Sequence, residues 1–266
     1  SFNSKIQENT SLHGSNSDID IKTPENKTYS DSMSGYYPGT FGFEDVPDDT
    51  TPSYCEYHAI GTTPDFVTSY TTVINNKVDG AGNAHNKVLL LKDGSGSSVC
   101  ISYLNFTDYG SEIARDGTFE FYHGINLAGT HYLSRIVLAG NHGTLFQIIF
   151  DTNALQINYL NGTGQYYTGV NLARDRWYRY SIDISCDGGY AGLGSNQFRF
   201  RIYDENDALI YTSYDMGFQD PHPTGGPNRI SMVSSQTQTQ VYEYMDAFCI
   251  TGLQDGYEIG DNLEEG

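Results

Sequence analysis

The sequence predicts an all-β fold, an antiparallel β-sandwich or jelly roll. From Phe41 onward, strand-sized runs recur about every ten residues, with Gly, Asn and Asp between them. No segment has the sustained periodicity of an amphipathic helix. Aromatic residues make up 14% of the chain, with 22 Tyr and 13 Phe, and these side chains favour half-buried pleated surfaces.

The expected strands follow one another along most of the chain. They span 41–45, 54–60, 87–91, 97–104, 118–125, 132–138, 145–151, 155–160, 166–170, 176–186, 197–204, 208–213, 228–233 and 240–251. The clearest alternation places Tyr178, Tyr180, Ile182 and Ile184 on one face of a strand, and Phe198, Phe200 and Ile202 on one face of the next. These faces are predicted to form core. Turns are expected at Asn161-Gly162 and at 204–207.

Residues 1–35 form a polar segment in which only 19–22 alternate as a strand does. We predict an extended N-terminal arm here, followed by one jelly-roll domain over 36–266. A polar arm without a core of its own becomes ordered when it pairs with a sheet edge, because backbone pairing requires no strong side-chain pattern. We therefore expect the arm to donate a strand and to mediate self-association.

The charge balance excludes several partners. The chain has 14 Lys and Arg against 33 Asp and Glu, and its formal net charge of −19 repels phosphate backbones and anionic lipid surfaces. Nucleic acid is therefore not an expected partner. No apolar run reaches the roughly 18–20 residues of a transmembrane segment. The chain starts at Ser1 without a hydrophobic signal core, so we expect that an export signal has been removed.

Cysteine and asparagine positions favour an extracellular or cell-surface location. The four cysteines are far apart and form no Cys-x-x-Cys pair, which excludes zinc-knuckle and thioredoxin-type sites. Among the three connectivities open to them, we favour the disulfides Cys55–Cys100 and Cys186–Cys249. Asn-x-Ser/Thr sequons predict N-glycosylation at Asn9, Asn26, Asn105 and Asn161.

Several stretches carry a resemblance to a known family. They are 35–44, 176–183, the Gly-Gly-Tyr-Ala-Gly-Leu turn at 188–193, 198–204, 242–248 and 259–266. Through them the chain, from residue 36 to residue 266, resembles the laminin-G-like (LamG-like), concanavalin A-like jelly rolls of secreted and surface proteins of archaea and bacteria. The resemblance implies two antiparallel sheets with a concave face, and adjacent first and last strands. It implies little about function, since the fold hosts lectins, adhesion modules, glycoside hydrolases and polysaccharide lyases.

A sugar-binding face needs aromatic rings for the C–H faces of pyranoses and planar polar side chains for their hydroxyls. The candidates are Glu120, Tyr122, Arg179, Arg199 and Arg201. A solvated outer sheet face shows the same residue types, so a purely structural role stays open. The sequence favours a surface protein over an enzyme: a self-assembling structural or adhesive subunit of a filament, sheath or appendage that binds glycans.

Two enzymatic alternatives stay open. A glycoside hydrolase needs two carboxylates at a fixed separation. The chain has no Glu-x-Asp-x-x-Glu run, so only separate strands can assemble a pair from carboxylates such as Glu112, Asp116, Asp183 and Asp246. A polysaccharide lyase needs Arg or Gln beside a uronate and Tyr or His to move a proton. Suitable residues are Arg179, Arg199, Arg201, Gln147, Tyr122, His123, His131 and His142, without the ordered strand motifs of alginate lyases.

No cofactor is predicted with named ligands. His123, His131 and His142 lack metal-ligand spacing, and we expect them to be solvated histidines of loops or strand edges. No P-loop, dinucleotide-binding fingerprint or nucleophile elbow is present. Calcium stays open as a cofactor because the chain is acidic and because jelly rolls of the kind that it resembles often bind calcium.

Overall fold

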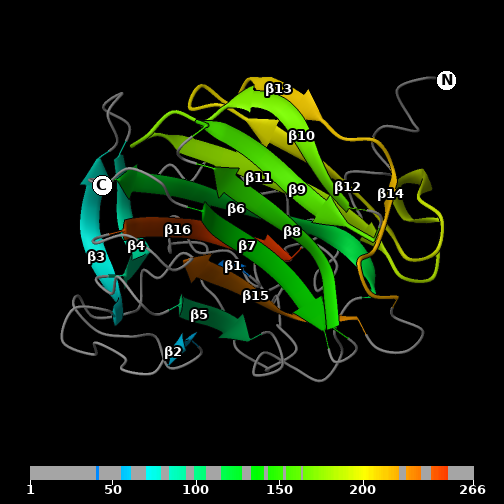
Figure 1. Cartoon of the computed structure of the whole chain (residues 1–266), viewed down its shortest axis with the longest axis horizontal. Coiled ribbons are helices and arrows are strands. Elements are labelled where there is room, and N and C mark those ends of the chain that lie inside the picture. The colour runs from blue at the N-terminus through cyan, green and yellow to red at the C-terminus, as the bar shows by residue number, and fades with distance from the viewer. Residues whose placement is uncertain are drawn as a thin grey trace, which may run out of the picture.

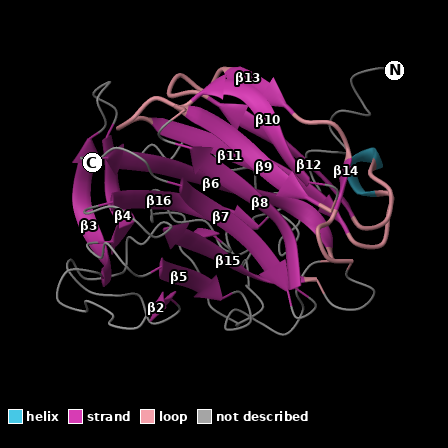
Figure 2. Cartoon of the chain, in the orientation of Figure 1, coloured by secondary structure: helices cyan, strands magenta, loops and turns pink. Residues whose placement is uncertain are grey.

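The computed structural model describes most of the chain from residue 40 to residue 250. The described residues are 40–41, 55–60, 70–78, 84–93, 99–105, 115–127, 133–140, 143–151, 154–162, 164–221, 226–234 and 241–250. They form two antiparallel sheets that pack face to face (Figure 1). Within these residues the one helical element is a 3-10 turn, Tyr190–Gly192 (Figure 2). The predicted all-β sandwich is confirmed.

The first sheet has nine strands. Its order is β13 (Leu209–Thr212), β12 (Gln197–Tyr203), β11 (Trp177–Ser185), β6 (Asp116–Leu127), β16 (Val241–Ile250), β4 (Ala84–Asp93) and β3 (Tyr70–Val78), and the short strands β1 (Thr40–Phe41) and β14 (Met216–Gly217) pair with β16 and β12. The pairing of β1 with β16 makes the first and last described strands neighbours, as the resemblance implies.

The second sheet has seven strands. Its order is β10 (Gly164–Asn171), β9 (Gln156–Asn161), β8 (Gly143–Asp151), β7 (Leu133–Gly140), β15 (Pro227–Ser234), β5 (Val99–Asn105) and β2 (Cys55–Ile60). All its ladders are antiparallel. The sheet ends at β10 and β2, and the edge strand β10 lies close to β13, the edge strand of the first sheet.

Alternating apolar side chains form the core between the sheets. The predicted inward residues of β11 and β12 are all buried: Tyr178, Tyr180, Ile182, Ile184, Phe198, Phe200 and Ile202. On the second sheet they meet side chains such as Phe146 and Phe150. Burial of each such side chain contributes about 1.5–3 kcal/mol, so this core fixes the register of both sheets.

Every predicted strand overlaps an observed one, but β3 and β14 were not predicted. β3 contains the polar run Asn75-Asn76-Lys77, so its apolar alternation is weak. It forms through its ladder with β4, where Val73 lies opposite Leu89. The Asn161-Gly162 turn is confirmed between β9 and β10. The turn at 204–207 is confirmed as well, with Asp204 Oδ1 accepting hydrogen bonds from the backbone of Asn206 and Ala208.

One expectation concerns a part of the chain beyond this description. The N-terminal arm, residues 1–35, lies outside the described residues, so its pairing stays a prediction. In the described part of the chain, no helix is long and apolar enough to cross a membrane.

Candidate functional site

The predicted binding residues share one face of the first sheet, which we call the charged face. It points away from the second sheet, because the alternating Phe119, Phe121 and Tyr180 face the core. Its members are Thr118, Glu120 and Tyr122 of β6, Arg179, Ser181 and Asp183 of β11, and Arg199, Arg201 and Tyr203 of β12. The structure therefore places all five predicted side chains side by side on three neighbouring strands.

Arg179 is held by two carboxylates. Its Nη1 atom lies 3.1 Å from Glu120 Oε1, and its Nη2 atom lies 2.7 Å from Asp207 Oδ1. The guanidinium carbon lies 3.7 Å from the centre of the Tyr203 ring, which is a cation–π contact. These contacts fix the plane of the guanidinium group in one orientation.

The two arginines of β12 are held in the same way but are more exposed. Arg201 Nη2 lies 2.7 Å from Asp183 Oδ2, and Asp183 Oδ1 accepts a hydrogen bond of 2.8 Å from Thr118. Arg199 Nη2 lies 2.6 Å from Asp215 Oδ1. The side chains of Arg199 and Arg201 are 24% and 25% exposed, whereas Asp183 is 5% exposed. Part of each arginine side chain therefore faces solvent.

Burial and neighbouring charges shift the pKa values of Glu120 and Arg179 in opposite directions. Burial raises the pKa of Glu120, against the opposing effects of a hydrogen bond with Ser181 and the charge of Arg179. Burial disfavours the charge of Arg179 as well, but the hydrogen bond to Asp207 and the charge of Glu120 outweigh it and raise the pKa of Arg179. The hydrogen bond to Asp183 raises the pKa of Arg201. Arg179 and Arg201 thus stay cationic, and burial favours the protonated form of Glu120.

A histidine–carboxylate pair adjoins Tyr122 and was missed by sequence reasoning. His85 Nδ1 of β4 lies 2.6 Å from Asp246 Oδ2 of β16, although the two residues are 161 positions apart. The His85 ring centre lies 4.1 Å from that of Trp177 and 5.0 Å from that of Tyr122. Asp246 is fully buried, and the His85 side chain is 9% exposed. A carboxylate that orients an imidazole is the arrangement of a general base.

Gln147 and His123, which were also proposed for a lyase, lie away from the charged face that holds the arginines and Tyr122. Gln147 points from the opposite face of the sandwich, where it donates to Gln219 and accepts from Arg135. His123 lies in the core, 1% exposed, with Nε2 3.3 Å from Glu243 Oε2 and its ring stacked on Phe150. The expectation that His123 is a solvated histidine is therefore wrong, because the inward position on β6 buries it. His131 and His142 lie outside the described residues.

The carboxylates considered for a hydrolase are dispersed, and the carboxylate that adjoins Asp183 is Glu120, which was not among them. Glu112 lies outside the described residues, and Asp116 accepts a hydrogen bond from Ser185 at the start of β6. Glu120 and Asp183, however, are diagonal neighbours on the charged face, because Asp183 lies opposite Thr118. Among the described residues, no group of three His, Cys, Asp or Glu side chains is placed to hold a metal ion.

The backbone register contradicts both predicted disulfides. Cys55 lies opposite Leu104 and Cys100 opposite Ala59, so the two cysteines are about 13 Å apart along the strands, whereas a disulfide needs Cα atoms within about 7 Å. Cys186 is buried and carries a free thiol. Cys249 lies on β16, opposite Glu120, far from Cys186 at the end of β11. Sequence spacing alone could not reveal these registers.

The asparagines of two of the four sequons lie in described strands. Asn105 ends β5, and Asn161 ends β9. Asn9 and Asn26 lie outside the described residues. Glycosylation of all four stays a prediction.

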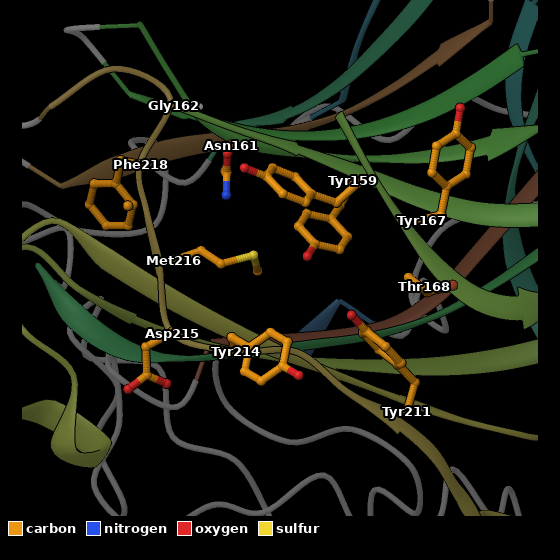
Figure 3. Close-up of a pocket in the computed structure, with 12 residues that line it drawn as sticks. Tyr159, Asn161, Gly162, Tyr167, Thr168, Tyr211, Tyr214, Asp215, Met216 and Phe218 are labelled. Carbon is orange, nitrogen blue, oxygen red and sulfur yellow. The ribbon is translucent and has the colours of Figure 1, made fainter. Parts of the chain in front are cut away.

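A hollow opens at the edge of the sandwich, between β9 and β10 of the second sheet and the segment that contains β13 and β14 (Figure 3). We call it the tyrosine hollow, and its volume is about 870 Å³. Five tyrosines line it: Tyr159, Tyr166, Tyr167, Tyr211 and Tyr214. Sequence reasoning missed it because its walls come from three separate segments.

No protein-family model matches this chain, and no curated protein matches it. Similar solved structures include a sialidase, with 9% identity, a TM-score of 0.49 and coverage of 73% of this chain and 16% of that chain. The catalytic domain of the glycoside hydrolase family 131 protein from Coprinopsis cinerea has 10% identity and a TM-score of 0.49. The match covers 79% of this chain and 87% of that chain. The Bacteroides ovatus mixed linkage glucan PUL GH16 protein, in complex with a G4G4G3G product, has 10% identity and a TM-score of 0.47. The match covers 79% of this chain and 98% of that chain.

These neighbours are carbohydrate-active proteins that contain a β-sandwich. At such identities the likeness concerns the fold and transfers no site to this chain. The chain spans 16% of the sialidase but most of the length of the other two. The function must therefore be argued from the side chains described above.

Proposed function

We propose that the protein is an extracellular surface protein that binds glycans through the charged face. The observation that carries the proposal is the joint placement of Arg199, Arg201, Arg179, Glu120 and Tyr122 on three adjacent strands. Carboxylates on this face or in adjoining segments hold the three guanidinium groups, so a ligand would not have to order them.

The chemistry of these groups suits sugar hydroxyls. Arg199 and Arg201 use part of their guanidinium groups for Asp215 and Asp183 and keep about a quarter of the side chain exposed. A guanidinium group has five N–H donors in a planar fork, so vicinal hydroxyls can be bound bidentately by the remaining donors. The ring of Tyr190, 36% exposed, whose hydroxyl lies 2.9 Å from Thr118 Oγ1, borders the same face. It offers a surface for the C–H side of a pyranose.

Glycan-array binding with purified variants tests the proposal. Arg199→Ala and Tyr122→Ala are expected to weaken binding to the array glycans at least about tenfold, which corresponds to ~1.4 kcal/mol. Arg229→Ala is the matched control, because Arg229 is exposed on the outward face of the second sheet. Absence of saturable binding by the wild type, or equal binding by all four proteins, would refute the charged face as a glycan site.

We propose further that the protein is an adhesive or structural subunit that self-associates through residues 1–35. The described strands leave edges for a donated strand: β13 and β3 end the first sheet, and β10 and β2 end the second. Deletion of residues 1–35 is expected to convert assemblies into folded monomers. Light scattering measures their mass and circular dichroism their fold. Unchanged mass after deletion contradicts this part of the proposal.

A second candidate function is a polysaccharide lyase, favoured by the His85–Asp246 pair beside Tyr122 and Arg179. In such a reaction a base removes the proton beside a uronate carboxylate, a C4–C5 double bond forms, and the glycosidic C4–O bond breaks. His85 or Tyr122 would take the proton and return one to the departing glycosidic oxygen, and Arg179 would face the carboxylate. The test is the ultraviolet absorbance of unsaturated product from uronate polymers. A signal that His85→Gln abolishes supports catalysis, and its absence in the wild type excludes it for those polymers.

A further inference from the structure

The tyrosine hollow contains a sequon asparagine. Asn161 ends β9, the turn continues through Gly162, and β10 begins at Gly164, which lies opposite Asn161. Residue 163 is a threonine, so the turn reads Asn-Gly-Thr, an acceptor sequence for N-glycosylation. The Asn161 side chain lines the hollow and extends into it between Phe218 and Tyr159 (Figure 3).

Aromatic rings surround the asparagine on its own face of the hairpin. Tyr159 precedes Asn161 by two residues, so both side chains lie on the same face of β9. Tyr166 lies opposite Tyr159, and the two rings stack with centres 5.2 Å apart and planes 12° apart. Tyr166 is 38% exposed, and Tyr214 on the opposite wall is 86% exposed. The rings of Tyr166 and Tyr214 therefore present apolar surface to water.

We propose that the tyrosine hollow is the seat of a glycan linked to Asn161, whose first sugars cover Tyr166 and Tyr214. The hollow has a volume of about 870 Å³, which falls in the range of sites for small ligands, about 300–1,000 Å³. Asp215 is the one charged residue of its lining and is held by Arg199 at 2.6 Å. A neutral ligand with apolar C–H faces therefore fits this lining better than an ion.

The link is formed by transfer from a lipid-pyrophosphate-linked oligosaccharide. The Asn161 amide nitrogen forms a bond to C1 of the first sugar, the bond between C1 and the phosphate oxygen breaks, and the lipid pyrophosphate leaves. The amide gives up one proton to the transferase. No oxidant or reductant is needed, and the acceptor Asn-Gly-Thr lies at a hairpin turn, where such sequons are used.

Local packing determines where the chain runs at this turn. A side chain at Gly162 would place its Cβ 2.6 Å from the Phe218 carbonyl oxygen, so only glycine permits this approach. The backbone amide of Phe218 donates to the Asn196 carbonyl, which ties the segment to the first sheet. The turn, and Asn161 with it, is therefore fixed against the wall that carries Met216 and Phe218.

This inference rests on the extracellular location in the proposed function, and the experiment imposes that location. The full chain is secreted from a eukaryotic cell behind a cleaved signal sequence, and peptide mass spectrometry measures occupancy of Asn161. The glycan is then trimmed to its first N-acetylglucosamine with an endoglycosidase. The trimmed protein is expected to melt about 2–4 °C above Asn161→Gln, measured by thermal unfolding.

The ring contact is tested by repeating the comparison in the Tyr166→Ala and Tyr214→Ala backgrounds. In each, the rise in melting temperature that the sugar causes is expected to fall to less than half. Tyr190→Ala, an exposed tyrosine outside the hollow, is the control and is expected to keep the full shift. Because each shift compares the trimmed protein with its Asn161→Gln counterpart in the same tyrosine background, a general loss of stability from the tyrosine substitution does not affect it. An unoccupied Asn161, or an equal shift in all backgrounds, overturns the proposal. Neither result bears on glycan binding by the charged face.

Discussion

Glu243 and Asp246 lie three residues apart on β16, on opposite sides of the first sheet, and each carboxylate meets a histidine. Glu243 Oε2 lies 3.3 Å from His123 Nε2 in the core, and Asp246 Oδ2 lies 2.6 Å from His85 Nδ1 beside the charged face. Both carboxylates are fully buried. One strand near the middle of the sheet thus carries a polar pair on each face, where apolar packing would otherwise be expected.

The core pair predicts a non-additive effect on stability. Glu243→Leu leaves the His123 ring among Phe150 and Tyr180 without its carboxylate partner. It is expected to lower the free energy of unfolding by about 1–3 kcal/mol. His123→Phe leaves Glu243 buried without the imidazole and is expected to cost at least as much. The double variant is expected to recover most of the loss, as measured by urea denaturation. Additivity within about 0.5 kcal/mol would contradict a coupled pair.

A buried hydroxyl predicts a stabilising substitution. Tyr180 is completely buried, and its hydroxyl has no hydrogen-bond partner among the described residues. Tyr180→Phe removes this polar group and keeps the ring, so the free energy of unfolding is expected to rise by about 1 kcal/mol or more. Tyr178→Phe is the matched control, because the Tyr178 hydroxyl accepts from the Ala173 amide at 2.9 Å. Its loss is expected to cost about 1 kcal/mol. A destabilising Tyr180→Phe would indicate a partner that the described residues do not include.

Alternation made the fold and the charged face predictable. In β11 and β12 each inward aromatic or aliphatic residue is followed by a polar one, so the core residues identify Arg179, Arg199 and Arg201 as outward. Local patterns cannot give the order of strands in a sheet. His85 and Asp246 come from β4 and β16, which adjoin only in the fold. The disulfides failed for the same reason, since they depend on long-range register.

Glu120 predicts a pH-dependent contribution to stability. Burial raises the pKa of Glu120, so the folded state holds this proton more tightly than the unfolded state does. The favourable contribution of this proton to the free energy of unfolding is therefore complete below the unfolded pKa of about 4.3. It is lost as the pH rises through the higher pKa of the folded state. Relative to Glu120→Gln, the wild type is expected to lose unfolding free energy over this window. Urea denaturation across a pH series measures it, and parallel curves for the two proteins would contradict a raised pKa.

Cys186 is expected to be inert in the folded protein. Its side chain is 3% exposed, and burial raises the pKa of its thiol to about 11, against the opposing charge of Arg115. Thiolate is the nucleophile, so at pH 8 only about one thiol in a thousand is reactive, and access is blocked as well. Iodoacetamide followed by peptide mass spectrometry is expected to leave Cys186 unmodified in native protein and to alkylate it fully in urea, without a reducing agent. If urea alone fails and reductant is required, Cys186 is in a disulfide after all, and the registers of β11 and β16 on β6 must be revised.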